Sequence, residues 1–129
     1  MEFNNRQAIY LQIADYLCER ILKRQWQEGE KIPSIRETAV MVEVNPNTAL
    51  RTYTFLQDQG IIYNKRGIGY FVAGDGYRKT LEYKKQNFVN EELPKVFHTM
   101  EVLDMEPADL EGYFREYQND QNNQNTKSA

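Results

Sequence analysis

The chain has 129 residues, of which 40% are apolar and 27% are charged, and its formal net charge is −3. This length allows one domain, or one domain with a small appendage. The single cysteine, Cys18, excludes an internal disulfide framework, and no apolar run approaches the roughly 20 residues that span a bilayer. The amino terminus lacks the pattern of a signal peptide, so we expect a cytoplasmic protein without a membrane partner.

The first predicted helix runs from Arg6 to about Gln25. Its apolar side chains recur at i, i+4 spacing, which is typical of a helix with one buried face. The two apolar rows are Ile9, Ile13, Leu17 and Ile21, and beside them Tyr10, Ala14 and Cys18. We interpret Cys18 as a buried structural thiol and Trp26, which follows the helix, as a core residue.

Two short helices separated by a very tight turn are predicted next. Ser34 and Glu37 form a capping-box pattern that starts a helix of about Ile35–Val42. Asn45 followed by Pro46 starts a second helix, which Gly60 can close in a left-handed conformation. This is the helix-turn-helix layout, whose second helix can enter a DNA major groove.

The second of these helices has two different faces. Ala49, Tyr53 and Leu56 share one face and are predicted to be buried. Asn47 and Arg51 lie on the other face, with Thr48 beside them. Amide, hydroxyl and guanidinium groups are suited to base edges and phosphates, although a capped surface helix would also fit this pattern alone.

A basic-tipped hairpin follows directly. Two apolar runs, 61–63 and 70–72, flank the loop 64–69. Lys65 and Arg66 at the tip could pair with phosphates, while Gly67 and Gly69 permit a close backbone approach. A helix pair followed by such a hairpin predicts a winged helix-turn-helix at residues 1–74.

Four stretches of this region together resemble the DNA-binding head of the GntR superfamily. They are Tyr10–Ile13, Gly29–Glu37, Val44–Thr48 and Gly67–Val72, and the third is similar to the YtrA-like subfamily. The resemblance implies a bacterial transcription regulator, usually a repressor, with a short helical region for dimerisation. This chain departs from many relatives at two positions. Arg24 stands where they have a glycine that closes the first helix, and Leu50 stands where they carry an arginine. We therefore expect the first helix to run on towards Trp26.

The DNA-binding candidates combine this resemblance with the analysis of faces. The resemblance supports anchoring by Ser34 and Arg36, the helix start, and the hairpin tip, whereas Arg51 follows from its face alone. The full set is Ser34, Arg36, Asn45, Asn47, Thr48, Arg51, Lys65, Arg66, Gly67 and Gly69. Because residues 1–75 carry nine basic and nine acidic side chains, affinity must come from local placement of charge.

Residues 75–118 are predicted to form a dimerisation region of two to three helices, after a hinge at residues 73–76. Its apolar stripe consists of Phe88, Val89, Leu93, Val96, Phe97, Met100 and Leu103. Pro94 allows two interpretations: a new helix capped by Asn90, or one continuous helix kinked near the proline. A last helix starts at Pro107, and the Asn/Gln-rich residues 119–129 are expected to be disordered.

The predicted fold is therefore mainly α with a small β-hairpin: a winged helix-turn-helix followed by a short C-terminal helical dimerisation region. We expect no enzyme, cofactor or metal site, because the only histidine, His98, has no metal-ligand partner at suitable spacing. The leading hypothesis is a sequence-specific repressor that binds a double-stranded, palindromic operator as a homodimer. The alternatives are a protein–protein interaction module and a regulator gated by a small effector at the C-terminal dimer interface.

Overall fold

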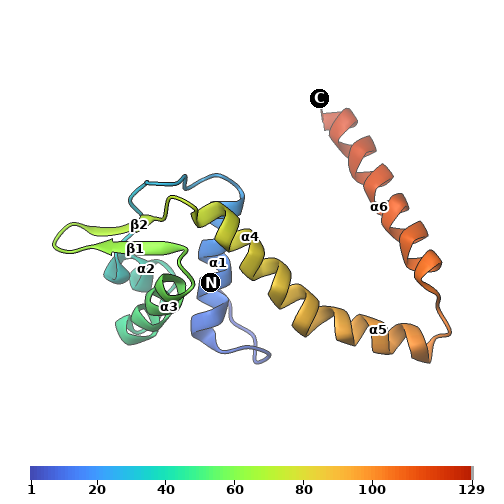
Figure 1. Ribbon diagram of the computed structural model, residues 1–129, viewed down its shortest axis with the longest axis horizontal. Helices are drawn as coiled ribbons and strands as arrows, with labels where there is room; N and C mark the ends of the chain where they lie inside the picture. Colours follow the sequence, from blue (N-terminus) through green and yellow to red (C-terminus); the bar gives the residue numbers. More distant parts are fainter. Residues whose placement is uncertain (129) are drawn as a thin grey trace. The chain divides into compact units, whose positions relative to one another are not determined.

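The computed structural model describes the backbone of residues 1–128 and the side chains of residues 1–125. The elements are α1 (Ile9–Leu22), α2 (Ile35–Met41), α3 (Pro46–Asp58), β1 (Ile62–Lys65), β2 (Gly69–Val72), α4 (Gly76–Asn87), a π-helical turn (Phe88–Glu92), α5 (Leu93–Val102) and α6 (Pro107–Ser128) (Figure 1). They form two compact units: unit 1, Met1–Gln86, and unit 2, from Asn87 onward. Helices with one antiparallel hairpin confirm the predicted fold class.

Unit 1 has a closed apolar core. Most of the predicted inner rows of α1 is buried, except at its start, where Ile9 is 45% exposed and Tyr10 is half-buried. Ile13 and Leu17 are fully inaccessible to solvent. They pack with Leu56 of α3 and with Ile61, which leads into β1. This core holds α3 against α1, because side chains of both helices take part in it. The face of α3 that it covers is the predicted apolar face.

Helix α1 is shorter than predicted. It ends at Leu22, and Arg24 takes a φ of 61°, a left-handed conformation. The amide of Gln25 donates to the carbonyl of Arg20, as in a Schellman C-cap. The predicted extension of this helix towards Trp26 is therefore wrong, because Arg24 ends it without a glycine. The arginine accepts the strained conformation, and its guanidinium carbon lies 3.7 Å from the ring centroid of Tyr77 in α4.

The helix-turn-helix closely follows its sequence signals. Ser34 Oγ accepts from the amide of Glu37 and the carboxylate of Glu37 accepts from the amide of Ser34, so the predicted capping box is present. Asn45 caps α3, Pro46 occupies its first turn, and Gly60 follows its end with a φ of 74°. The turn between the helices places Glu43 in the left-handed region, with a φ of 57°.

The hairpin forms the wing of unit 1. Its strands pair antiparallel, from Ile62 opposite Val72 to Lys65 opposite Gly69. The segment before α2 extends the pairing, because the amide of Ile32 donates to the carbonyl of Tyr70 over 2.9 Å. The wing is thus joined to the start of α2 as well as to α3.

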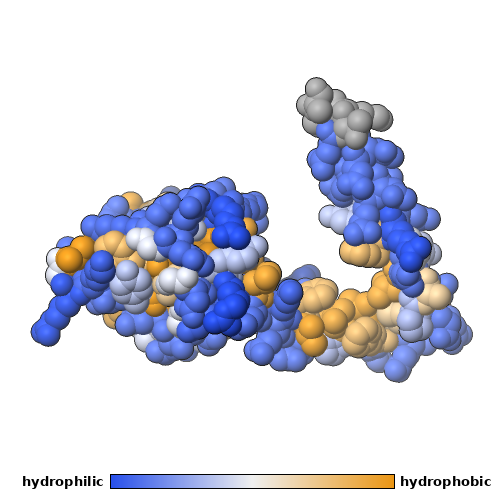
Figure 2. All heavy atoms as spheres, turned by 45° about the horizontal axis from the view of Figure 1, so that its top comes forward, coloured by the Kyte–Doolittle hydropathy of each residue, from blue (hydrophilic) through white to orange (hydrophobic). Residues whose placement is uncertain are grey.

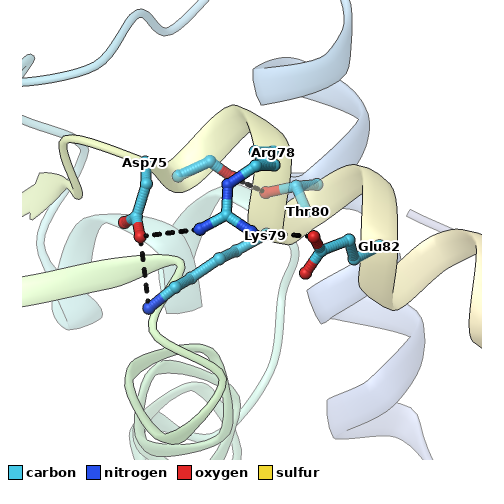
Figure 3. Close-up of polar contacts among 6 residues, drawn as sticks. Asp75, Arg78, Lys79, Thr80 and Glu82 are labelled. Carbon is cyan, nitrogen blue, oxygen red and sulfur yellow. Dashed lines mark hydrogen bonds and ion pairs between the residues drawn. The ribbon is translucent and has the colours of Figure 1, made fainter.

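The predicted hinge at residues 73–76 is instead a packed connection inside unit 1. Gly76 is buried, and a Cβ there would lie 2.8 Å from the carbonyl oxygen of Ile61. Its own carbonyl accepts from Thr80 Oγ1, while Asp75 pairs with Arg78 and Lys79 at the start of α4 (Figure 3).

Further along, α4 packs on the other helices of unit 1. The ring of Tyr83 meets that of Phe55 at 5.3 Å between centroids, and Lys84 Nζ lies 3.1 Å from Asp15 Oδ1. The predicted boundary at residue 74 therefore falls within unit 1. The hinge prediction is wrong because Gly76 allows close packing against its neighbours and does not mark a flexible backbone.

In unit 2 the backbone stays helical through Pro94. Asn90 does not cap a new helix, because the residues before the proline form a π-helical turn closed by the amide of Leu93 and the carbonyl of Phe88. Proline cannot donate to the carbonyl four residues earlier and its ring crowds that group. The wider turn accommodates this, so the continuous-helix interpretation is the one observed.

Helix α6 corrects the expected disorder of the tail. It continues through residues 119–128, and the described side chains of this stretch are exposed; residue 129 lies outside the described residues. Their composition argues against a packed core, as predicted. It does not prevent a helix, because no proline or glycine follows Gly112 to stop one.

Candidate nucleic-acid interface

The amino-terminal half of α3 presents a polar face to solvent. Asn47 and Arg51 are exposed, Thr48 is half-buried, and the apolar Leu50 beside them is 46% exposed. The opposite face, with Ala49, is buried, as the spacing predicted. Thr54 and Asp58 continue the exposed face towards the carboxyl end.

The start of α3 is shaped by its cap. Asn45 Oδ1 accepts from the amide of Asn47 over 2.8 Å, which occupies the amide oxygen of Asn45 in the cap. No acidic side chain stands in the first turn. Pro46 has no amide hydrogen, and the amides of Thr48 and Ala49 donate to the carbonyl of Asn45. The attraction for phosphate at this end of α3 therefore comes from the positive end of the helix dipole.

The candidates on α2 differ in how free they are. The hydroxyl of Ser34 is engaged in the capping box, so a phosphate contact there would reach it from its other side or through the backbone. Arg36 is exposed and lines a shallow groove with Glu43 and Pro46. The structure thus places Arg36 beside the start of α3.

Tyr53 fixes the angle between α2 and α3, a role that the sequence did not reveal. Its hydroxyl lies 2.7 Å from Thr38 Oγ1 and donates to the carbonyl of Pro33, at the beginning of α2. Burial raises the pKa of Tyr53 to about 12, even though the hydrogen bond with Thr38 opposes that change. The hydroxyl therefore stays protonated and can keep donating.

The wing tip carries the other candidates. Lys65 ends β1, and Arg66, Gly67 and Ile68 form the loop, with Gly67 at a φ of 79°. Lys65, Arg66, Gly67 and Ile68 are all exposed. Gly69 has a φ of 142°, and a Cβ there would meet the side chain of Lys31 at 2.9 Å. Lys31 is thus a further cation beside the wing. The only indication of it in the sequence is its position directly before Ile32 and Pro33.

These groups come from three elements, and the structure brings only some of them together. Asn47, Thr48 and Arg51 share one groove, while Arg36 lies near Pro46. The base of the wing packs on α3 through the rings of Tyr53 and Tyr70, 4.9 Å apart, whereas its tip projects away from the helices (Figure 1).

The cations of the interface are available to an external anion. The ion pairs among the described side chains involve cations elsewhere: Lys23, Arg78, Lys79, Lys84 and Arg115. With α4 included, unit 1 carries thirteen Lys or Arg and ten Asp or Glu, a net charge of +3. The balance of zero counted for residues 1–75 therefore understates the positive charge of the folded unit.

Other chemistry finds little support in the described residues. Cys18 is buried, and burial with the nearby Asp15 carboxylate raises the pKa of its thiol to about 12, so it is a poor nucleophile. The described side chains contain no group of three or more His, Cys, Asp or Glu able to hold a metal ion. None of the described helices combines the length and hydropathy needed to cross a membrane.

Comparison with known proteins decides the family. Residues 9–72 match the model of the gntR family of bacterial regulatory proteins. The chain is 32% identical over 108 residues to the helix-turn-helix transcriptional repressor YtrA of Bacillus subtilis, covering 84% of this chain and 82% of YtrA. The chain belongs to the gntR family. It is a DNA-binding transcriptional regulator, not an enzyme, and its similarity to YtrA confirms the predicted subfamily.

Two other similar proteins extend the comparison. The regulator YhcF of Bacillus subtilis is 43% identical over 72 residues, which are 56% of this chain and 60% of YhcF. A crystal structure of a GntR-family protein from Bacteroides thetaiotaomicron is 42% identical, with a TM-score of 0.76. It covers 88% of this chain and 99% of that protein, so the likeness includes the helices after the wing.

Proposed function

We propose that this gntR-family regulator is a repressor that reads a palindromic operator as a homodimer. The observation that carries the proposal is the exposed, uncovered amino end of α3, with Asn47 and Arg51 on its outer face. Asparagine reads adenine and arginine reads guanine through paired hydrogen bonds in the major groove. The similar protein YtrA is named a transcriptional repressor, which supports the sign of regulation.

The wing supplies contacts of a different kind. Lys65 and Arg66 are exposed cations on a tip with two glycines, suited to phosphates on either side of a groove. Together with Ser34 and Arg36, they position the helix without reading sequence. The proposal thus separates base readers on α3 from positioning groups on α2 and the wing.

Selection of binding sites from random DNA with the wild-type chain, followed by fluorescence anisotropy, tests this division. Asn47→Ala and Arg51→Ala should each cost roughly 1–3 kcal/mol on the selected site and relax preference at one base pair. Gln59→Ala, at the other end of α3, is the matched control. Unchanged affinity and base preference for Arg51→Ala would refute its reading role.

Lys65→Ala should behave differently. Because it contacts phosphate in this proposal, its loss should weaken all duplexes about equally and reduce the salt slope by about one. Lys85→Ala, on the exposed side of α4, provides a change of equal charge outside the interface. A loss of affinity for only one DNA sequence would indicate instead that Lys65 contacts a base.

Dimerisation is proposed from the apolar surface of unit 2. Its exposed stripe includes Phe97 at 50% and Leu103 at 61%, and α6 adds Phe114 at 58%. Figure 2 shows hydrophobic residues gathered along α5 and the start of α6. Helices α5 and α6, of 10 and 22 residues, enclose little core alone, so a second copy is the proposed cover. A two-fold pair would present two α3 helices to half-sites roughly 34–36 Å apart.

Sedimentation equilibrium tests this assembly on the full chain. Phe97→Asp should raise the dimer dissociation constant by at least roughly 100-fold, because a charge would be buried in the interface. Val40→Asp, which changes a 78% exposed apolar side chain of unit 1, should leave it unchanged. A wild-type chain that stays monomeric while binding a palindrome would refute the dimer.

One groove in unit 2 keeps the effector-gated alternative in view. Val96, Met100, Met105 and Leu110 line an open, mainly apolar space of about 320 Å³ between α5 and α6. A small apolar effector could bind there when two copies close over it. A metabolite that raises the melting temperature and changes operator affinity in the wild type, but not in Met100→Trp, would support this second candidate.

A further inference from the structure

The start of α1 and the start of α3 enclose a shallow groove of about 310 Å³. Ala8, Ile9 and Tyr10 line it from α1, and Asn47, Thr48 and Arg51 line it from α3. The groove therefore contains the two proposed base readers and, on its other wall, one aromatic ring. No role was assigned to that ring from the sequence, where Tyr10 appeared as part of an apolar row.

Arg51 lies on this ring. Its guanidinium carbon is 4.0 Å from the centroid of Tyr10, within the range of a cation–π contact. Arg51 is exposed and makes no ion pair with a described side chain, so Tyr10 is the contact that orders the end of its side chain. A long, unbranched side chain without such a contact would sample many rotamers.

Tyr10 is itself held in two ways, at its ring and at its backbone. It meets the ring of Phe55 edge to face at 6.1 Å, and Phe55 in turn meets Tyr83 of α4 at 5.3 Å. The carbonyl of Tyr10 accepts from Thr52 Oγ1 over 2.8 Å, which fixes its backbone to α3. A ring anchored in this way can set the position of whatever lies on it.

The separation of 4.0 Å between the guanidinium carbon and the ring centroid allows the flat face of the guanidinium to lie on the ring. In that arrangement its N–H donors, which lie in the plane of the group, stay free to bind another acceptor. Those in-plane donors make the bidentate contact to the N7 and O6 atoms of guanine. The contact with Tyr10 is therefore compatible with base reading and restricts where the donors can point.

We propose that Tyr10 is a positioning residue for Arg51, so that base selectivity depends on α1 as well as on α3. This inference rests on the proposed reading role of Arg51. The tyrosine acts through its ring: it holds the guanidinium at the α1 side of the reading face before DNA arrives. Its hydroxyl is not needed for this effect.

A double-mutant cycle on the full chain tests the inference, with the DNA site selected by the wild type as probe. Tyr10→Leu should weaken binding roughly 3- to 10-fold and flatten preference at the base pair that Arg51→Ala identifies. Tyr10→Phe, which keeps the ring, should bind within about twofold of the wild type. In an Arg51→Ala background, Tyr10→Leu should have an effect of less than about twofold.

A matched control comes from the same helix. Tyr16 lies under Arg20 in a similar pair, at 4.8 Å between guanidinium carbon and centroid, and it does not line the groove. Tyr16→Leu should leave operator affinity and base preference unchanged. Thermal unfolding of each variant separates a loss of folded protein from a loss of selectivity.

The outcomes separate two kinds of failure. An effect of Arg51→Ala with none of Tyr10→Leu would overturn the positioning role and leave the proposed function standing. Equal losses from Tyr10→Leu in both backgrounds, or from Tyr10→Phe and Tyr10→Leu alike, would also overturn it. No effect of Arg51→Ala would refute the reading role itself, and the positioning role with it.

Discussion

The two units of this regulator use apolar side chains in opposite ways. Unit 1 encloses Leu17, Leu56 and Ile61 almost completely. In unit 2, by contrast, Phe97 and Phe114 are half-exposed, and among the described residues of that unit Met100 is the one buried apolar side chain. Their charges differ as well: unit 1 carries a net +3 and residues 87–129, with three basic and nine acidic side chains, carry −6. This difference matches the proposed roles, in which unit 1 faces DNA and unit 2 is covered by a second copy of the chain.

The largest expected effect tests whether the first core is closed and the second open. Leu17→Ala should lower the free energy of unfolding of unit 1 by about 2–5 kcal/mol, because it leaves a cavity in a close-packed core. Phe114→Ala, which removes more apolar surface from unit 2, should cost under about 0.5 kcal/mol at concentrations where the chain is monomeric. Urea unfolding at two protein concentrations measures both.

A concentration-independent loss for Phe114→Ala as large as that for Leu17→Ala would break the comparison. It would mean that Phe114 is buried within its own chain in solution. The control is Leu17→Met, which keeps the volume and should cost under about 1.5 kcal/mol.

Alkaline titration provides the next largest effect. Burial raises the pKa of Cys18 from 9.0 to about 12, and those of Tyr53 and Tyr83 from 10.0 to about 12. Above pH 9 the unfolded chain loses these protons first, so it binds fewer protons than the folded chain. Stability of unit 1 should therefore fall between about pH 9 and 12, by up to about 1.4 kcal/mol per pH unit for Cys18.

Cys18→Ala separates the thiol from the two phenols. In this variant the fall should begin near pH 10 instead of pH 9, as followed by thermal unfolding across the range. Stability that stays constant to pH 11 in the wild type would show that these groups are not buried in solution.

The smallest expected effect concerns the turn between α2 and α3. Glu43 has a φ of 57°, a conformation that costs a side chain about 1 kcal/mol relative to glycine. Glu43→Gly should therefore stabilise unit 1 by about 0.5–1 kcal/mol in thermal unfolding. Glu43→Ala keeps the strain and should show no gain; an equal gain would point to the charge as the cause.

The sequence predicted most of unit 1 because its elements begin with strong local signals. The Ser34–Glu37 box, the Asn45–Pro46 start and the glycine-containing hairpin loop each specify a structure within a few residues. The exposed face of α3 followed from the same periodicity that identified its buried face.

Two wrong predictions, the longer first helix and the hinge, came from contacts distant in sequence. Arg24 ends α1 where a glycine was the expected signal, and its ring partner Tyr77 lies more than fifty residues away. Gly76 suggested flexibility, yet its neighbour in space is the carbonyl of Ile61. Likewise, the pairing of Arg51 with Tyr10 joins two helices whose separate patterns gave no sign of it.

The packed connection between β2 and α4 determines where this molecule can be recombined with its relatives. A chimera that joins residues 1–74 to another protein would lack Tyr83 and Lys84. It would therefore lose their contacts with Phe55 and Asp15, which pack α4 on the rest of unit 1. The segment to transfer ends instead after Gln86, and it includes most of α4 together with α3 and the wing.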